Sequence, residues 1–288
     1  LLWPKIQQAF GEKVLTYEQR LKTIDNISLS DICEHHTRTH TTDNLRFVIA
    51  GKIDESRRDK IIASLEQISL PRGERFDLIT DPLETPHEPV YIARPDLKNI
   101  SFGLSLVLPR QLSDDEMDAM DALNHIITGT MHSRIFGQAR KRGLAYGIYS
   151  GTSRGVNDSS WDFEGQTNFD TAKPLFELVV TELKRILSGE ISETELEAMK
   201  SFALGSFQMS GQTVASTAGF YAGRYFWDGG IRDFEKQPEL IREISLDKML
   251  KVAREFIDAN CWSFGAVSGG EVEQVNELNA EISKLFEK

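Results

Sequence analysis

The feature that most constrains the fold of this chain is an internal repeat, in which the end of the sequence resembles its beginning. Near the start, "ISLSDI" (27–32) leads through a helical stretch to the apolar run "RFVIAG" (46–51), and a second helical pattern follows. Near the end, "ISLDKM" (244–249) leads in the same way to "SFGAVSG" (263–269) and another helical pattern. The copies lie about 217 residues apart, and self-similarity at a fixed spacing indicates a duplicated structural unit.

This spacing predicts a structural unit of roughly 200 residues. Residues 86–288 then form one complete repeat, and residues 1–85 are the second half of an earlier repeat together with a linker. The linker is expected at 71–89, where Pro, Asp and Glu are frequent and no apolar period is visible. The first half of the earlier repeat would lie outside this sequence.

Hydrophobic periodicity predicts alternating helices and strands in both parts. In the half repeat, Ser28 with Asp31 three residues later is the expected N-cap of one helix, a strand is expected at 45–51, and Asp54 begins a second helix. The elements expected in the complete repeat are strands at 90–94, 100–108, 145–153 and 160–168, helices at 113–127, 171–187, 192–211 and 213–228, and a final helix, strand and helix within 245–286. We therefore predict an α+β fold, in which a duplicated, mixed and mainly antiparallel sheet packs with helices.

Charge and cysteine content argue against several kinds of protein. The 33 basic and 44 acidic residues give a net charge of −11, which does not favour binding to nucleic acid or to an anionic membrane surface. Cys33 and Cys261 are isolated, so they form neither a disulfide framework nor a thiolate metal site. No apolar stretch approaches the roughly 18 residues of a membrane-spanning helix. We expect a soluble protein whose compartment stays open, with the cytoplasm as the first expectation.

Three segments carry a resemblance to a known family. The segment 129–151 ("GTMHSRIFGQARKRGLAYGIYSG") resembles the Gly-rich loop, Ser-Arg-Leu-Phe sequence and basic run before Gly-Leu-Ala-Tyr of the pitrilysin and insulinase family of zinc peptidases, the inverzincins. The segments 189–207 and 44–54 are similar to two further patterns of that family, in the same order. The resemblance implies that two repeats form a half-shell and that two half-shells close around a peptide.

The zinc motif of that family, His-x-x-Glu-His, does not occur in this sequence. The resemblance therefore implies no metal site or cofactor in this chain, and zinc in the full-length protein or in a partner subunit. On the helix that corresponds to the zinc helix, Asp121, Asn124 and His125 stand where the family has His, Glu and His, but an asparagine cannot act as a general base. We interpret these three residues as structural. His36 and His40 are four residues apart, and we expect them to face solvent.

The resemblance also suggests candidate substrate contacts. In the family, an arginine and a tyrosine of the second repeat hydrogen-bond the backbone of the substrate beside the zinc, which positions the scissile carbonyl. Tyr146 matches the tyrosine. The arginine usually lies seven residues earlier, where this chain has Ala139, so Arg140 fits only with a deletion of one residue, and Arg142 is a further candidate. One residue rotates a helix by about 100°, so Arg140 need not point in the family's direction.

Two functions follow from these observations. In the first, the chain is the C-terminal, non-zinc-binding portion of a zinc-dependent metalloendopeptidase that hydrolyses peptides in a closed chamber. In the second, it is a catalytically inactive family member that serves as a substrate-binding or structural partner subunit. Both imply a peptide substrate and a complementary zinc-bearing half or related subunit, in a homodimer or heterodimer. We expect the isolated chain to be inactive.

Overall fold

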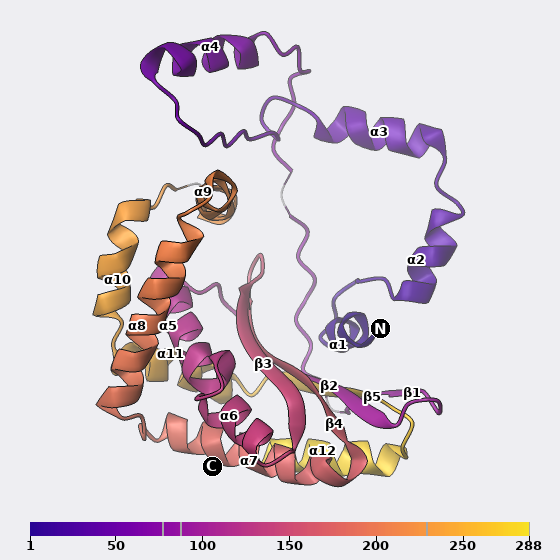
Figure 1. Ribbon diagram of the computed structural model, residues 1–288. Helices are drawn as coiled ribbons and strands as arrows, with labels where there is room; N and C mark the ends of the chain where they lie inside the picture. Colours follow the sequence, from indigo (N-terminus) through magenta and orange to yellow (C-terminus); the bar gives the residue numbers. More distant parts are fainter. Residues whose placement is uncertain (77, 87, 229, 288) are drawn as a thin grey trace. The chain divides into compact units, whose positions relative to one another are not determined.

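The computed structural model describes residues 1–76, 78–86, 88–228 and 230–287 (Figure 1). The chain divides into two compact units. The first, which we call the sheet unit, contains Leu1–Gln19, Thr80–Ser201 and Glu243–Lys288. The second, which we call the helical unit, contains Arg20–Ile79 and Phe202–Arg242. The division of the sequence into a half repeat and a complete repeat at residue 86 is a statement about duplication, and it stays a prediction.

The sheet unit is built on one five-stranded sheet with the strand order β1-β5-β2-β4-β3. Its strands are β1 (Val90–Ala93), β2 (Asn99–Leu108), β3 (Ala145–Arg154), β4 (Ser159–Asn168) and β5 (Trp262–Ser268). Only β1 and β5 are parallel, and the other three pairs are antiparallel. The α+β fold with a mixed, mainly antiparallel sheet is therefore confirmed.

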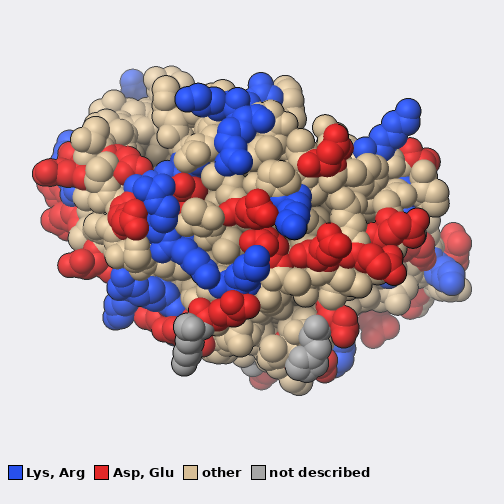
Figure 2. Space-filling view, turned by 90° about the horizontal axis from the view of Figure 1, so that it is seen from below, with Lys and Arg blue, Asp and Glu red and all other residues tan. Residues whose placement is uncertain are grey.

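One face of the sheet packs against a layer of helices. The helices of this layer are α5 (Asp114–Asn124), α6 (Arg134–Lys141), α7 (Phe169–Leu187), α11 (Leu246–Ala259) and α12 (Val272–Ser283). Alternation along each strand directs large side chains into this layer: the Phe264 and Phe176 rings are 5.3 Å apart, and Trp161 is fully buried. On the outward face of the layer, which α7 and α12 form, basic and acidic side chains are interspersed (Figure 2).

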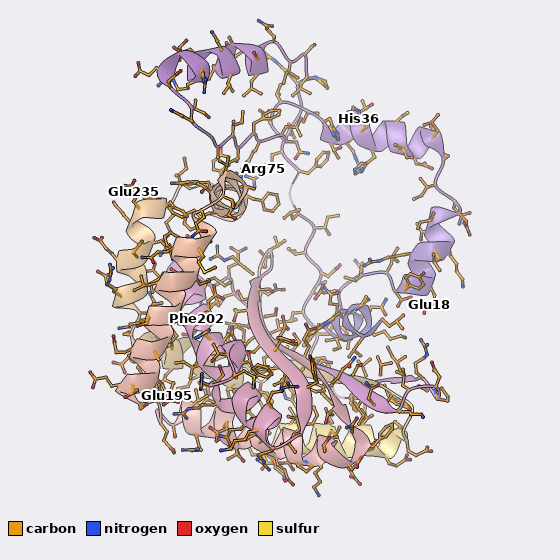
Figure 3. All side chains as sticks on the ribbon, viewed as in Figure 1. Glu18, His36, Arg75, Glu195, Phe202 and Glu235 are labelled. Carbon is orange, nitrogen blue, oxygen red and sulfur yellow. The ribbon has the colours of Figure 1, made fainter. Side chains whose placement is uncertain are left out.

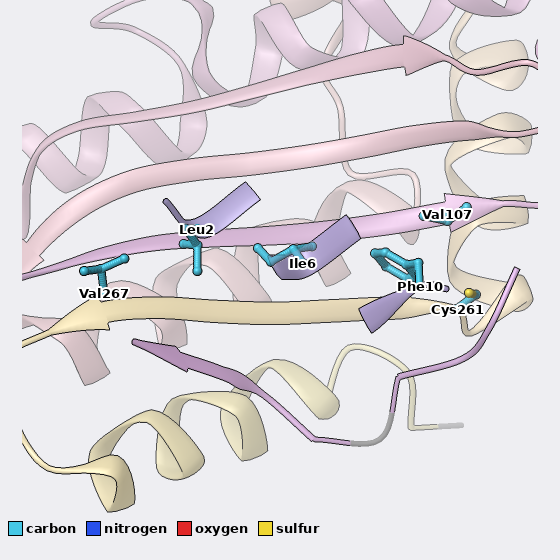
Figure 4. Packing of buried hydrophobic residues seen from close by; sticks show 6 residues of the cluster. All are labelled: Leu2, Ile6, Phe10, Val107, Cys261 and Val267. Carbon is cyan, nitrogen blue, oxygen red and sulfur yellow. The ribbon is translucent and has the colours of Figure 1, made fainter. Parts of the chain in front are cut away.

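The opposite face of the sheet, which we call the open face, carries the first helix, α1 (Leu2–Ala9), over β1, β5 and β2. The Leu2, Ile6 and Phe10 side chains are buried there in a cluster that also includes Val107, Cys261 and Val267 (Figure 4). The helix approaches closely because glycines lie beneath it. A Cβ atom on Gly265 would be 2.9 Å from Leu2, and one on Gly103 would be 3.1 Å from Ile6.

The helical unit contains no strand within its described residues. Its helices are α3 (Leu29–Thr39), α4 (Glu55–Glu66), α9 (Val214–Asp228), the 3₁₀ turn Phe234–Lys236, α10 (Gln237–Glu243) and parts of α2 (Tyr17–Ile24) and α8 (Glu193–Ser210). The capping box of Ser28 and Asp31 and the Asp54 cap are confirmed. His36 projects from α3, is exposed and stacks on His40, as expected of a solvent-facing pair (Figure 3).

The strand predicted at 45–51 does not form, so that prediction is wrong. The segment that the predicted duplication relates to it, β5, hydrogen-bonds to two neighbouring strands, β1 and β2. No strand lies beside 45–51 in the described part of the chain, and an extended segment cannot form a ladder alone. Several of its apolar side chains are left partly exposed, with Phe47 53% and Ile49 49% exposed.

Candidate functional site

The candidate site begins where α6 ends and β3 starts. The Gly143 and Leu144 backbone N–H groups donate back to the Arg140 and Ala139 carbonyls at 3.1 and 2.8 Å. Gly143 has φ +68°, a left-handed conformation that a residue with a Cβ adopts only at a cost. This C-terminal cap reverses the chain within two residues, so the basic end of α6 lies beside the first residues of β3.

A β-bulge at Tyr146 then sets the direction of the tyrosines. Ala145 lies opposite Thr167 and Gly147 lies opposite Gln166, so Tyr146 is an extra residue in the ladder. In a regular strand, Tyr146 and Tyr149 would point to opposite faces because they are three residues apart. Because of the bulge, both side chains point to the open face and line the same cleft, where Tyr146 is 82% and Tyr149 is 59% exposed.

Arg140 contacts Tyr146 directly. Its guanidinium lies 4.5 Å from the centre of the Tyr146 ring, and its Nη1 donates to the Tyr146 carbonyl at 3.3 Å. Ala139, the position where the family has its arginine, is fully buried against the core. The one-residue offset therefore brings Arg140 to the surface on the side of Tyr146. Arg142 is exposed and forms the C-cap of α6.

The cleft of about 590 Å³ lies between α1, β3 and β4. The Trp3 indole N–H donates to Glu164 Oε2 at 2.9 Å, across the cleft from α1 to β4. Asp162 lies two residues before Glu164 on β4 and therefore on the same face of the sheet. It is largely buried, and it accepts hydrogen bonds from Ser105 and Ser160 at 2.6 and 2.7 Å. Burial raises the pKa of the Asp162 carboxyl above its ordinary value.

The free edge of β3 is partly covered by the turn that follows α5. This π-helical turn, His125–Gly129, places Thr128 beside the strand, and the Ser150 backbone N–H donates to Thr128 Oγ1 at 2.9 Å. The Asn124 amide also donates to Thr152 Oγ1 at 3.0 Å. A peptide that added to this edge as a sixth strand would have to displace the Thr128 contact, so the open face is the more accessible surface.

Asp121, Asn124 and His125 line a smaller pocket of about 350 Å³. The Asn124 Oδ1 accepts from the buried Trp161 indole N–H at 2.9 Å, and burial lowers the pKa of His125. Asparagine is not a zinc ligand of the usual kind, and this one is engaged by the core. Among the described residues, no three His, Cys, Asp or Glu side chains are grouped so that they could hold a metal ion. These residues therefore do not fit zinc.

Sequence reasoning identified Arg140 and Tyr146, which the structure brings together, but missed Trp3 and Glu164. These two residues are 161 positions apart, and no local motif relates them. The signal available was the alternation in "SWDFEGQTN" (160–168), whose even-numbered residues are polar and lie on the open face.

The family model described as "Peptidase M16 inactive domain" matches residues 26–202, which is more than half of the chain. The chain belongs to the M16 peptidase family. This is the pitrilysin and insulinase family, so the resemblance seen in the sequence is confirmed. A search of curated proteins finds no match. Within the described residues, no helix of this M16 chain is long and apolar enough to cross a membrane.

Solved structures similar to this M16 chain share its fold. A peptidase M16 inactive domain from Pseudomonas fluorescens is 19% identical with a TM-score of 0.78, and the match covers 92% of this chain and 64% of that one. A protease from Helicobacter pylori is 17% identical with a TM-score of 0.71, covering 86% and 61%. A chain of complex III2 from Candida albicans is 12% identical with a TM-score of 0.74, covering 92% and 64%. The chain thus spans less than two thirds of these structures.

Proposed function

We propose that this chain is the substrate-positioning, non-zinc-binding portion of an M16 metalloendopeptidase. The observation that carries this proposal is the pair formed by Arg140 and Tyr146 at the rim of the cleft. Both side chains are exposed, and both offer hydrogen-bond donors to a peptide in the cleft: the guanidinium N–H groups and the phenol O–H. The peptidase fold shared with the Helicobacter pylori protease is consistent with this role.

The pair would act on the substrate by orientation and charge. The Arg140 guanidinium is held by the Tyr146 ring and carbonyl, so little conformational freedom is lost when it meets a peptide carbonyl. Its positive charge would stabilise negative charge that develops on that carbonyl oxygen. Tyr146 would hold the neighbouring backbone, and the partly covered edge of β3 would leave the peptide lying on the open face.

Zinc chemistry would come from another polypeptide segment, because no group of His, Cys, Asp or Glu side chains among the described residues fits the ion. The apolar segment 45–51 supports such a complement. It has no regular secondary structure and is mostly exposed, and its counterpart β5 is stabilised by two neighbouring strands. We expect the missing neighbours to be supplied by a zinc-bearing N-terminal half or by a family-related subunit, and the assembly to be a homodimer or heterodimer that closes around the peptide.

The test is the zinc content and peptidase activity of this chain beside those of the longer product that this proposal expects from its gene, each with and without a chelator. We expect the 288-residue chain to hold no stoichiometric zinc and to cleave no peptide, and the longer product to hold zinc and to lose activity with the chelator. Cleavage by the chelator-treated 288-residue chain would overturn the proposal.

A second candidate, a non-catalytic partner or structural subunit, is favoured by one observation. The family's arginine position is Ala139, and its burial in the core leaves no room for an arginine there. The fold is also shared with a chain of complex III2 from Candida albicans. If the longer product neither bound zinc nor cleaved peptides, this candidate would replace the first. Co-purification would then be used to find a companion subunit that carries the metal.

A further inference from the structure

We propose that the cleft beside Tyr146 is a subsite for a basic side chain of the bound peptide, with Glu164 as its counter-charge. This inference rests on the proposed function, since it names the kind of substrate that the peptide-binding surface selects. It concerns binding alone, and it can be tested on this chain without zinc or catalysis.

Glu164 is the only acidic or basic side chain among the described residues that line the cleft. The Trp3 indole donates to one carboxylate oxygen, Oε2. Within the described residues, the other oxygen makes no hydrogen bond or ion pair, so it is available to an ammonium or guanidinium group. The Trp3 bond also fixes the direction of the carboxylate, which reduces the entropy lost when a cation binds.

The walls of the cleft suit the stem of a lysine or an arginine. Tyr146 and Tyr149 present exposed rings on the same side, and Trp3 lies opposite them on α1. Aromatic faces attract cations and also contact the methylene groups of long basic side chains. A contact between a cation and one of these rings already exists within the chain, since the Arg140 guanidinium lies 4.5 Å from the Tyr146 ring centre.

The surrounding charge favours a basic side chain over an acidic one. Asp162 lies two residues before Glu164 on the same side of β4, and the two carboxylates repel each other. A cation in the cleft would relieve this repulsion, whereas an acidic side chain would increase it. The net charge of −11 adds a long-range attraction for basic peptides. Arg140, whose guanidinium lies over the Tyr146 ring, is not among the residues that line the cleft.

The experiment measures the affinity of this chain for three fluorescent peptides by anisotropy at low salt. The peptides are nine residues long, blocked at both ends, and identical except for a central lysine, norleucine or glutamate. Norleucine matches the lysine stem without its charge. We expect the lysine peptide to bind about tenfold more tightly than the norleucine peptide, as for a charge-assisted hydrogen bond. The glutamate peptide should bind most weakly.

Two variants assign the preference to Glu164. Glu164→Gln should reduce the difference between lysine and norleucine to less than about twofold, and Glu164→Lys should make the glutamate peptide the preferred one. Glu277→Gln is the matched control, since it removes the same charge from an exposed position on α12, in the helix layer on the other face of the sheet. It should leave all three affinities unchanged.

The outcomes separate this inference from the function on which it rests. Equal binding of the three peptides, or a lysine preference that survives Glu164→Gln, would overturn the subsite but leave peptide binding intact. A preference for glutamate in the unaltered chain would assign the cleft to acidic side chains through Arg140 instead. The absence of binding by every peptide would refute the proposed function as well.

Discussion

Replacement of Gly165 by alanine tests the close approach of strands beneath the cleft. A Cβ atom on Gly165 would lie 2.8 Å from the Gly147 carbonyl oxygen and 2.9 Å from Phe102 Cζ. The first atom belongs to the backbone of β3 at the bulge. The second belongs to a ring that is 3% exposed and lies 4.9 Å from the ring of Phe176. Neither contact can be relieved by the rotation of a free side chain.

The size of the effect follows from these distances. Overpacking of this kind costs about 1–3 kcal/mol, and the restriction of the unfolded chain by alanine returns roughly 0.5–1 kcal/mol. We therefore expect Gly165→Ala to lower the free energy of unfolding by about 1 kcal/mol, and by no more than about 2.5 kcal/mol. Gly151→Ala is the control, because nothing lies within 4 Å of a Cβ at that position on the neighbouring strand. It should be neutral or slightly stabilising.

The assay is thermal unfolding followed by tryptophan fluorescence, to which the buried Trp161 contributes a signal from the sheet unit. A net difference of about 2 kcal/mol between the two variants corresponds to roughly 4–8 °C in Tm for a unit of this size. Equal Tm values for Gly165→Ala and Gly151→Ala would refute the reasoning, since they would show that β3 can move away from β4 at little cost. The displaced bulge should also weaken peptide binding in the first variant only.

Three further predictions follow from the contacts of single side chains. Asn124→Ala removes the acceptor of the buried Trp161 indole and should destabilise the chain by about 2–3 kcal/mol in urea unfolding. Hydrogen bonds from Arg134 lower the pKa of Glu195 to about 2, so its carboxylate stabilises the fold above its ordinary pKa of 4.5 and loses this effect as the pH falls from 4.5 toward 2. Glu195→Gln should cost about 1–2 kcal/mol at neutral pH, after allowance for partial exposure, and should flatten the loss of stability across that acidic range. Tyr146→Ala should change the unfolding free energy by less than about 0.5 kcal/mol, because the side chain is 82% exposed, yet it should weaken peptide binding measured by anisotropy.

Each of these predictions has a contradicting result. If Asn124→Ala had the same urea midpoint as the unaltered chain, the Trp161 indole would have found another acceptor. An unchanged pH profile in Glu195→Gln would show that the ion pair is fully screened by solvent. A large loss of stability in Tyr146→Ala would assign that residue a packing role in place of substrate contact.

The helices and most strands could be predicted because their determinants are local. Ser28 and Asp31 are three residues apart, and the capping box they form is visible in the sequence. The alternation of polar and apolar residues in "SWDFEGQTN" (160–168) likewise marks β4 and its polar face. Such patterns involve residues within one or two helical turns or along one strand, so they can be recognised from residues that are close together in the sequence.

Local pattern was not sufficient for the segment 45–51, which does not form a strand. Its composition is that of a strand, as in β5, but a strand exists only when another strand pairs with it. The bulge at Tyr146 is a similar case, because it is defined by the register against β4 and not by the residues of β3 alone. Local pattern could identify that tyrosine but not the face to which it points.

The sequence by itself determined the family, the α+β class and the candidate pair of Arg140 and Tyr146, since motifs, caps and periods are written in neighbouring residues. Only the tertiary structure decided that this pair is in contact, that both tyrosines face one cleft, and that Trp3 orients Glu164 there. The last contact joins residues 161 positions apart. Its formation depends on how α1 packs over the sheet, and packing between distant segments follows from shape and burial that no local pattern contains.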